Sequence, residues 1–360
     1  MTHNRVMHER YFDNAATTPV DPRVVAEMLP YFTEFPGNAA TIHHYGQKAK
    51  AAIDLARERV AALIQAEDPS QITFLSGSSE VNNWVLGNYK EGKVAISPYE
   101  HSSIVKLAKR DGFTVLPPFE ECLPEGFDIV ALMSVNNEVG TIFDTENIRR
   151  RTKSRNLLVD VTQSAGKLPT FAGETDYISA SGHKFYCPKG VGFLYQREVN
   201  LKPFLLGGGQ EMGRRGSTAN VPGIVALGAA AALAIDEMYD RIAHATHLKS
   251  IVTNDILKIS DSQINGPGEK SPYVLNASFK GIHGETLLIE LDQAGYCCSS
   301  GAACSSTSKE PSSVLVALGL TPEWMRGTVR ISFGKFNTAQ AAEDLGRDIT
   351  RIVEKLRALK

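Results

Sequence analysis

Short apolar runs alternate with longer amphipathic stretches over the first two thirds of the chain. The stretch 47–65 carries apolar residues at three- and four-residue spacing, which predicts an amphipathic helix. Short apolar runs typical of buried strands lie at 72–75, 94–96, 129–133, 157–159, 177–180 and 192–195. Because helical stretches separate the early runs, the pattern predicts an α/β fold with a mostly parallel central sheet.

The pattern changes after about residue 237. A charged helical stretch at 236–259 precedes an apolar run at 274–279, two helices around a loop, a strand at 328–333 and a final amphipathic helix. This order is typical of a smaller α+β domain. We therefore expect a large α/β domain over 14–238, and a small α+β domain formed by 1–13 and 239–360.

Composition narrows the class of protein. A chain of 360 residues is long enough for two domains, and its net charge of −2 argues against general affinity for nucleic acid. A hydrophobic fraction of 42% excludes a disordered chain. The five cysteines are an odd number without the spacing of a disulfide framework, which indicates a reducing compartment.

We expect a cytoplasmic protein that does not span a membrane. No apolar segment follows the first residues, so no secretory signal is predicted. The longest apolar run, 221–235, contains Pro222 and Gly223 and falls short of the ~20 residues that cross a bilayer. Its Ala and Gly content instead predicts a closely packed core helix.

An acid and a lysine follow two successive predicted strands. Asp160 closes the run 157–159, and Lys184 follows the run 177–180 in a Ser-Gly-His-Lys turn. Ligand sites of open α/β sheets lie at the carboxyl ends of strands, so both side chains are expected at one sheet edge. A desolvated lysine amine can form a Schiff base, and a carboxylate can pair with a cationic ring nitrogen or a metal. The alternatives are a helix-capping acid and a solvated surface lysine.

A turn of small residues follows the predicted strand 72–75. Gly77-Ser78-Ser79-Glu80 precedes the helical pattern 81–86, and backbone N–H groups and hydroxyls at such a turn suit a phosphate. Any serine-rich helix cap has a similar sequence, and the Walker and Rossmann spacings are missing. A phosphate site, an amine and an acid together nevertheless indicate pyridoxal 5'-phosphate (PLP).

A tract of small residues at 299–308 carries one thiol, Cys304. One interpretation is an incidental cysteine in a mobile loop. Because an exposed thiol invites oxidation, the alternative is that this thiol has a function.

With these motifs in place, the sequence resembles the cysteine desulfurases, PLP enzymes of the class V aminotransferase group, along nearly its whole length. The matching segments are Tyr11–Pro19, Gly37-Asn38 with His43 and Gly46, Ser76–Glu80 with Asn83, Glu100-His101, Asn136–Gly140, Val159–Ser164, Ser181–Lys184, Gly207–Glu211, Arg215–Asn220, Ser299–Cys304 and Arg330–Gly334. The tract from Cys304 to Pro311 has the length of the long-loop branch that serves nitrogen fixation and iron–sulfur cluster assembly. The resemblance implies the fold type I of PLP-dependent transferases, with the small domain carrying the cysteine loop at about 297–311.

The resemblance also implies a role for each matching residue. Lys184 would bind PLP covalently, Asp160 would keep the pyridine nitrogen protonated, and His101 would stack on the ring and move protons. The other ring contacts would be Gln163 and Asn137, and the phosphate contacts Ser78, Ser79, Ser181, His183 and, from the other subunit of a homodimer, Thr218. Arg330, with Asn14, would bind the substrate carboxylate. Cys304 would take sulfur from L-cysteine as a persulfide and release L-alanine.

Some positions depart from the family pattern. Ser79 replaces a usual Thr, Cys187 a usual Gly and Ala39 a usual Pro, and the segment 111–135 is shorter than usual. Cys297 and Cys298 replace plain apolar residues, and they are either buried hydrophobes or resolving thiols. None of these changes removes a chemical group from the implied mechanism.

The resemblance implies partners and leaves alternatives. Expected partners are L-cysteine and sulfur-acceptor proteins such as an iron–sulfur cluster scaffold, without direct nucleic-acid or membrane binding. No resident metal is expected, although Cys304 could transiently ligate a cluster shared with a scaffold. A selenocysteine lyase or another PLP β-lyase remains an alternative, as does a docking platform with a decayed cofactor site. An aminotransferase would have no use for Cys304.

Overall fold

The computed structural model describes residues 8–119, 121–300 and 312–359. The helices and strands in chain order are α2 (Pro22–Met28), α3 (Pro30–Thr33), α4 (His44–Leu63), β1 (Ile72–Leu75), α5 (Ser78–Asn88), β2 (Val94–Ile96), α6 (Ser102–Asp111), β3 (Thr114–Val115), β4 (Ile129–Met133), α7 (Thr145–Thr152), β5 (Asn156–Asp160), β6 (Tyr177–Ser181), η2 (Gly182–Lys184), β7 (Gly192–Gln196), α8 (Val221–Ile256), β8 (Ser262–Ile264), β9 (Val274–Phe279), α9 (Gly284–Gln293), α10 (Ser313–Ala317), α11 (Pro322–Arg326), β10 (Thr328–Ser332) and α12 (Ala339–Ala358). Short 3₁₀ turns η1 (Pro69–Gln71) and η3 (Gln210–Gly213) complete the order.

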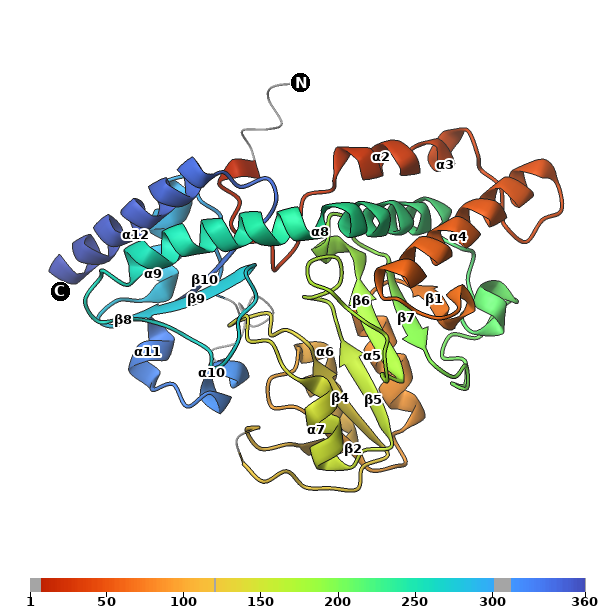
Figure 1. The fold of residues 1–360 in the computed structure, drawn as a ribbon, viewed down its shortest axis with the longest axis horizontal. Coiled ribbons are helices and arrows are strands. Elements are labelled where there is room, and N and C mark those ends of the chain that lie inside the picture. Colours follow the sequence, from red (N-terminus) through yellow and green to blue (C-terminus); the bar gives the residue numbers. More distant parts are fainter. Residues whose placement is uncertain (1–7, 120, 301–311, 360) are drawn as a thin grey trace. The chain divides into compact units, whose positions relative to one another are not determined.

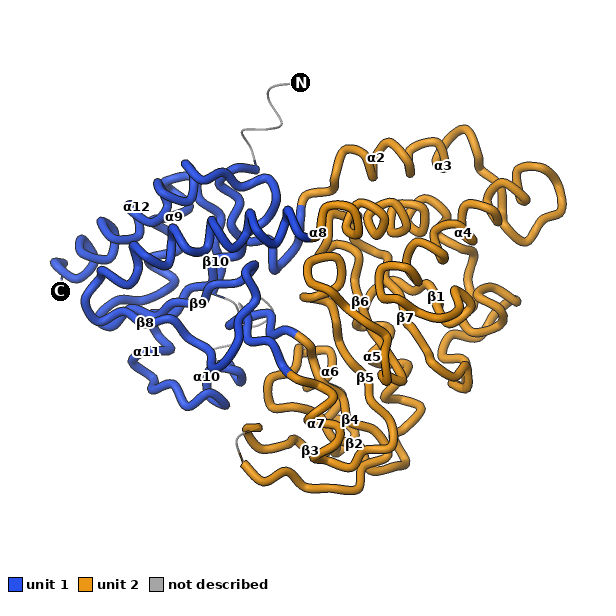
Figure 2. The backbone as a smooth tube through the Cα atoms, in the orientation of Figure 1, with its two compact units in different colours: residues 1–18, 135–143, 239–360 blue, residues 19–134, 144–238 orange. Residues whose placement is uncertain are grey.

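The chain divides into two compact units (Figure 2). Unit 1 comprises residues 1–18, 135–143 and 239–360, and unit 2 comprises residues 19–134 and 144–238. These bounds differ from the expected domains at 14–18 and 135–143, which group with unit 1. Hydrogen bonds between distant parts of the chain tie both segments to unit 1: Asn14 Nδ2 donates to the Ser332 carbonyl (3.0 Å), and Asn276 Nδ2 donates to the Glu138 carbonyl (3.0 Å).

Unit 2 is built on a seven-stranded sheet of order β1-β7-β6-β5-β4-β2-β3 (Figure 1). The strands β6, β5, β4, β2 and β3 run parallel to one another, whereas β7 is antiparallel to both β6 and β1. The mostly parallel sheet is therefore as predicted. Strands β4 and β6 are buried along their whole length, which explains the continuous apolar run of β4, whereas β6 also buries the small polar residues Ser179 and Ser181.

Helices α5, α6 and α7 pack against this sheet, with α5 on β6, β7 and β1, α6 on β2, and α7 on β4. The core beneath α5 includes the buried Trp84, Val85 and Leu86. Helix α4 begins at His44, earlier than the predicted helix 47–65, because the ring of His43 caps it by accepting the Gly46 N–H at 3.3 Å.

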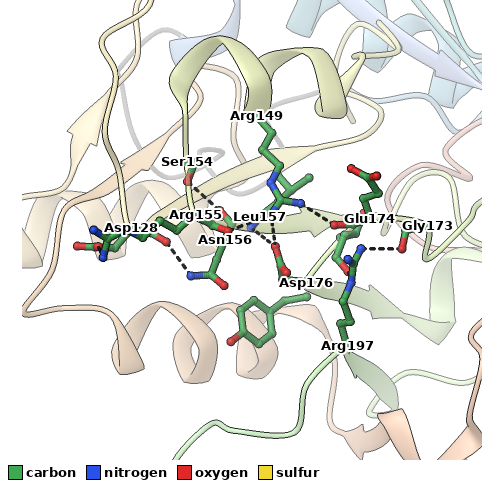
Figure 3. Close-up of polar contacts among 12 residues, drawn as sticks. Asp128, Arg149, Ser154, Arg155, Asn156, Leu157, Gly173, Glu174, Asp176 and Arg197 are labelled. Atoms are coloured by element: carbon green, nitrogen blue, oxygen red, sulfur yellow. Dashed lines mark hydrogen bonds and ion pairs between the residues drawn. The ribbon is translucent and has the colours of Figure 1, made fainter.

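The amino ends of β5 and β6 are joined by a polar network around Arg149 (Figure 3). The Arg149 guanidinium donates to the carbonyls of Glu174 (2.6 Å) and Arg155 (2.9 Å) and pairs with Asp176 at 3.1 Å. Asp176 also accepts the Leu157 N–H at 2.8 Å. This network satisfies backbone groups at the amino ends of these two strands.

Unit 1 carries a three-stranded antiparallel sheet of order β10-β9-β8. Helix α9 packs on β10 and on α12, and α11 packs on β9. The predicted strands 274–279 and 328–333 correspond to β9 and β10, which confirms the α+β character of this part of the chain.

Helix α8 is continuous from Val221 to Ile256, so the predicted core helix 221–235 and charged helix 236–259 are one element. Among the described residues, it alone is long and apolar enough to cross a membrane. In the most apolar part of this helix, 67% is buried inside the structure. Core helices of soluble proteins can be equally long and apolar, and this burial agrees with the predicted core helix.

Candidate active site

Asp160 ends β5 with its side chain buried at 5% exposure. Its Oδ1 accepts the Thr162 N–H at 2.9 Å, and its Oδ2 accepts a hydrogen from Asn82 Nδ2 at 3.2 Å. Two N–H donors therefore hold a carboxylate that has little contact with water, which is the arrangement required for pairing with a cationic ring nitrogen.

Lys184 lies next to Asp160 in the order of the sheet. β6 pairs parallel to β5 with Asp160 opposite Ser179, and the turn η2 carries Lys184 directly beyond the end of β6. The charges of Asp160 and Lys184 both act on His101, so the three groups share one neighbourhood. The lysine and the acid thus follow neighbouring strand ends, in the arrangement that the sequence suggested.

The start of α5 forms a cradle of N–H and hydroxyl groups. Ser78 is the first residue of this helix, and both its N–H (2.8 Å) and its Oγ (2.9 Å) contact Ser181 Oγ at the end of β6. Gly77 precedes it at φ 154°, where a Cβ atom would lie 3.0 Å from Ser181 Oγ. Ser79 is exposed one residue further on. A helix N-terminus with two serines suits an anion.

His101 caps the start of α6. Its Nδ1 accepts the Ser103 N–H at 3.2 Å and lies 2.9 Å from Ser103 Oγ. Burial is the largest influence on its pKa and lowers it, with Lys184 acting in the same direction and Asp160 opposing. The ring is therefore neutral near pH 7, as a group that accepts and returns protons requires.

The remaining predicted residues of unit 2 lie close by in the chain and are largely buried. Gln163 is 5% exposed, and its Oε1 accepts a hydrogen bond from the buried Lys167 Nζ at 3.2 Å. Burial, followed by the charge of Lys184, lowers the pKa of His183 to about 4, so this imidazole is neutral as well. The role of each residue remains a prediction.

Arg330 and Asn137 belong to unit 1. Arg330 is 2% exposed, its Nη2 pairs with Asp13 Oδ1 at 2.7 Å, and its Nη1 donates to the Asn137 carbonyl at 2.9 Å. These contacts fix the direction of the guanidinium. Asn14 Nδ2 donates to the carbonyls of Tyr11 (2.8 Å) and Ser332, and it also lies 3.3 Å from Asn337 Oδ1.

Cys304 lies outside the described residues. Of the other cysteines near the predicted loop, Cys297 is exposed and Cys298 is half-buried. Partial loss of water around the Cys297 sulfur raises the pKa of this thiol, and the charges of Asp292 and Asp13 act in the same direction. Burial of the Cys298 sulfur, followed by the charge of Asp13, raises the pKa of that thiol. Burial also raises the pKa of Cys187. These three thiols are thus held in the protonated form, which is the less nucleophilic one.

Asn82 and Ser103, which the sequence motifs did not single out, connect Asp160 to His101 through hydrogen bonds. The sequence contains only a weak indication of these two residues. Asn82 stands four residues after Ser78, on the same face of α5, and Ser103 stands two residues after His101.

Glu100 is a buried carboxyl group directly before His101. Its Oε1 accepts hydrogen bonds from Ser97 Oγ (2.5 Å) and the Met133 N–H (2.8 Å), and its Oε2 has no partner in the described part of the chain. Burial, reinforced by the charge of Asp160, raises its pKa from 4.5 to about 8. The group is therefore a neutral acid near pH 7.

This raised pKa predicts a pH dependence of stability. Between pH 4.5 and about 8, the folded state keeps a proton on Glu100, whereas the unfolded chain has already released it. The free energy of unfolding therefore falls as the pH rises through this window. Glu100→Gln does not titrate and is expected to remove that fall. In urea unfolding, the stability of the variant relative to the wild type should increase up to about pH 8 and then level off. A constant difference over the window would contradict the assignment.

The residues of unit 2 fit PLP. The buried carboxylate of Asp160 matches a protonated pyridine nitrogen, the Lys184 amine can condense with an aldehyde, and the cradle at Ser78 and Ser181 matches a phosphate. These donors lie at the carboxyl edge of a mostly parallel sheet, the usual place for a ligand in such a fold.

Comparison with known proteins agrees with this fit. The family model of class-V aminotransferases matches residues 10–345. The cysteine desulfurase of Trichormus azollae is 38% identical, with 97% of this chain and 94% of the relative covered. Cysteine desulfurase IscS 1 of Archaeoglobus fulgidus is 37% identical, with 97% and 98% covered.

Solved structures give the same result. A NifS-like protein superimposes with a TM-score of 0.87 at 34% identity, covering 96% of this chain and all of its own. SspA, solved in complex with cysteine, has a TM-score of 0.78 at 29% identity and covers 91% of this chain and 100% of its own. Fold, cofactor class and sequence agree: the chain belongs to the class-V aminotransferases, which use PLP, and within them to the cysteine desulfurases.

Proposed function

We propose that this protein removes sulfur from L-cysteine, releases L-alanine and passes the sulfur to acceptor proteins from a persulfide on Cys304. The observation that carries the proposal is the placement of Asp160 and Lys184 at the ends of neighbouring parallel strands, with the charges of both acting on His101. The full-length similarity to cysteine desulfurases supports the choice of substrate.

PLP, when bound, supplies an electron sink for the pair of electrons released at the substrate Cα. Asp160 would hold a proton at the pyridine nitrogen by the charge of its carboxylate. Lys184 would carry the cofactor and, once released, move a proton to or from the substrate. The neutral ring of His101 would stack on the cofactor and accept or return a proton.

The remaining residues would bind and orient the cofactor and the substrate. Ser78, Ser79, Ser181 and His183 would hold the phosphate, and Gln163 and Asn137 would contact the phenolic oxygen side of the ring. Arg330 would bind the substrate carboxylate with its fork of N–H donors, and Asn14 would assist either directly or through the backbone that it holds. Contact of the substrate with Arg330 would compete with its pairing to Asp13.

Cys304 would act as the sulfur acceptor. Its thiolate would form a bond to the substrate sulfur, the carbon–sulfur bond would break with its electron pair left on carbon, and protonation there would give alanine. Cys304→Ser is expected to lower sulfur removal by at least about 100-fold, because a hydroxyl is a poor nucleophile toward sulfur. Mass spectrometry after a pulse of cysteine locates the added sulfur by peptide.

The matched controls for this experiment are Cys297→Ser and Cys187→Ser, which we expect to retain turnover because neither thiol is assigned a chemical step. Sulfur appearing first on Cys297 or Cys298, together with turnover by Cys304→Ser, would identify a different thiol. Alanine and sulfide as products distinguish a desulfurase from an aminotransferase, which would give a keto acid.

We also propose an obligatory homodimer in which Thr218 of one chain contributes to the phosphate site of the other. Thr218 is exposed, and its loop is anchored where Glu211 pairs with Arg57 through two contacts of 2.9 and 3.0 Å. Analytical ultracentrifugation at assay concentration should find active dimers, and an active monomer would contradict the proposal. The acceptor class, including an iron–sulfur scaffold, and a reducing cytoplasmic location are part of the same proposal.

A further inference from the structure

Asn82 is a fully buried amide on α5 that no step of the proposed chemistry uses. Its Nδ2 carries two hydrogens, and both are engaged: one with Asp160 Oδ2 at 3.2 Å and one with Ser103 Oγ at 3.1 Å. Asn82 therefore joins the end of β5 to the start of α6, where Ser103 contacts His101.

The other end of this amide is unsatisfied. Asn82 Oδ1 is buried and has no hydrogen-bond partner among the described residues. Turning the amide over would place that oxygen against the Asp160 carboxylate, which is less favourable still. A buried acceptor without a donor destabilises the fold. The unpaired oxygen gives no reason to have an amide at this position, so the reason must be the two hydrogen bonds that its N–H groups donate.

Ser103 transmits the contact to His101. Its backbone N–H donates to His101 Nδ1 at 3.2 Å, so Nδ1 is an acceptor and the neutral ring carries its proton on Nε2. Ser103 Oγ accepts from Asn82, and its own hydrogen can then point to Nδ1 at 2.9 Å. Each contact in this series favours the same tautomer.

We propose that Asn82 is a positioning residue that links Asp160 to His101 through Ser103, and that it keeps His101 neutral with its proton on Nε2. The inference rests on the proposed function, in which His101 exchanges protons with the substrate. The charged groups that act on the ring are Asp160 from β5, Lys184 from η2 and Lys106 from α6, and Glu100 precedes it in the chain.

The test is histidine NMR on the full chain without cofactor. The chain has nine histidines, and His101→Gln assigns the signal of interest. The wild type should show a neutral ring protonated on Nε2 near pH 7. Asn82→Asp replaces the two donors with a carboxyl group that shares a proton with Asp160 and accepts the hydroxyl hydrogen of Ser103. Ser103 Oγ is then free to accept from a protonated Nδ1, so the titration midpoint of His101 should rise by about 1 unit or more.

The matched control is Asn83→Asp, the same change one residue along α5, where the side chain is partly exposed and contacts the Ser79 carbonyl. We expect a smaller shift there. In a Ser103→Ala background, the shift caused by Asn82→Asp should fall to less than about half, because the hydroxyl link is gone. Equal shifts in the Asn82 and Asn83 variants, or a shift independent of Ser103, would overturn the proposal.

Ser103→Ala alone tests the same link if Asn82→Asp does not fold. It should change the Nδ1 resonance and the titration midpoint of His101, and an unchanged titration overturns the proposal. The outcome is distinguishable from a failure of the proposed function, since protonation is read without cofactor or substrate, whereas the desulfurase proposal is tested by its products.

Discussion

Replacement of Lys184 by alanine is expected to abolish cysteine turnover and the visible absorption of lysine-bound PLP. Lys184 follows β6 in the turn η2, next to the strand that ends in Asp160, and it is the amine assigned to carry the cofactor. Without that amine, the protein loses both its covalent attachment to PLP and the proton carrier released when substrate binds. The measurements are the absorption spectrum before and after borohydride, and alanine formation from cysteine.

Two variants make this experiment specific. Lys184→Arg keeps the positive charge but should not restore activity, because a guanidinium does not form the imine. Lys189→Ala removes an exposed lysine five residues along the chain and should retain both absorption and turnover. Turnover near the wild-type rate in Lys184→Ala would show that another amine, or no amine, carries the cofactor.

Asp160→Asn should leave PLP loosely bound and slow the reaction by about 100-fold or more. The substitution keeps the shape of the side chain but removes the charge that would hold a proton at the pyridine nitrogen, so less electron density is withdrawn from the substrate Cα. It also replaces one of the two carboxylate oxygens, of which Oδ1 accepts from the Thr162 N–H and Oδ2 accepts from Asn82 Nδ2. The measurements are cofactor affinity by spectral titration and the single-turnover rate with cysteine.

The control for Asp160→Asn is the same substitution at Asp176, in the network at the amino ends of the strands (Figure 3). Asp176→Asn is expected to lower the unfolding temperature while leaving the absorption spectrum of the bound cofactor unchanged. If Asp160→Asn behaves in the same way and retains most of its activity, then Asp160 is a structural cap and the ring-nitrogen role is wrong.

The main elements of the fold could be predicted because burial leaves a strong pattern in the sequence. The strand β4 is buried on both faces and therefore carries an unbroken apolar run. The strands β3 and β8 were missed, since they are two and three residues long and are not buried. The antiparallel direction of β7 also leaves no mark on its composition.

The sequence by itself determined which residues carry the candidate chemistry, because motif order and strand ends place Asp160, Lys184 and Ser78 at one sheet edge. Only the tertiary structure decided how they are supported. The link from Asn82 through Ser103 to His101, and the proton retained by Glu100, depend on burial and on hydrogen bonds between segments distant in the chain. The sequence shows which side chains are apolar, but it does not show which polar groups lose their contact with water. That loss occurs only when the segments pack together, and it both shifts the pKa of a buried acid and strengthens the hydrogen bonds of a buried amide.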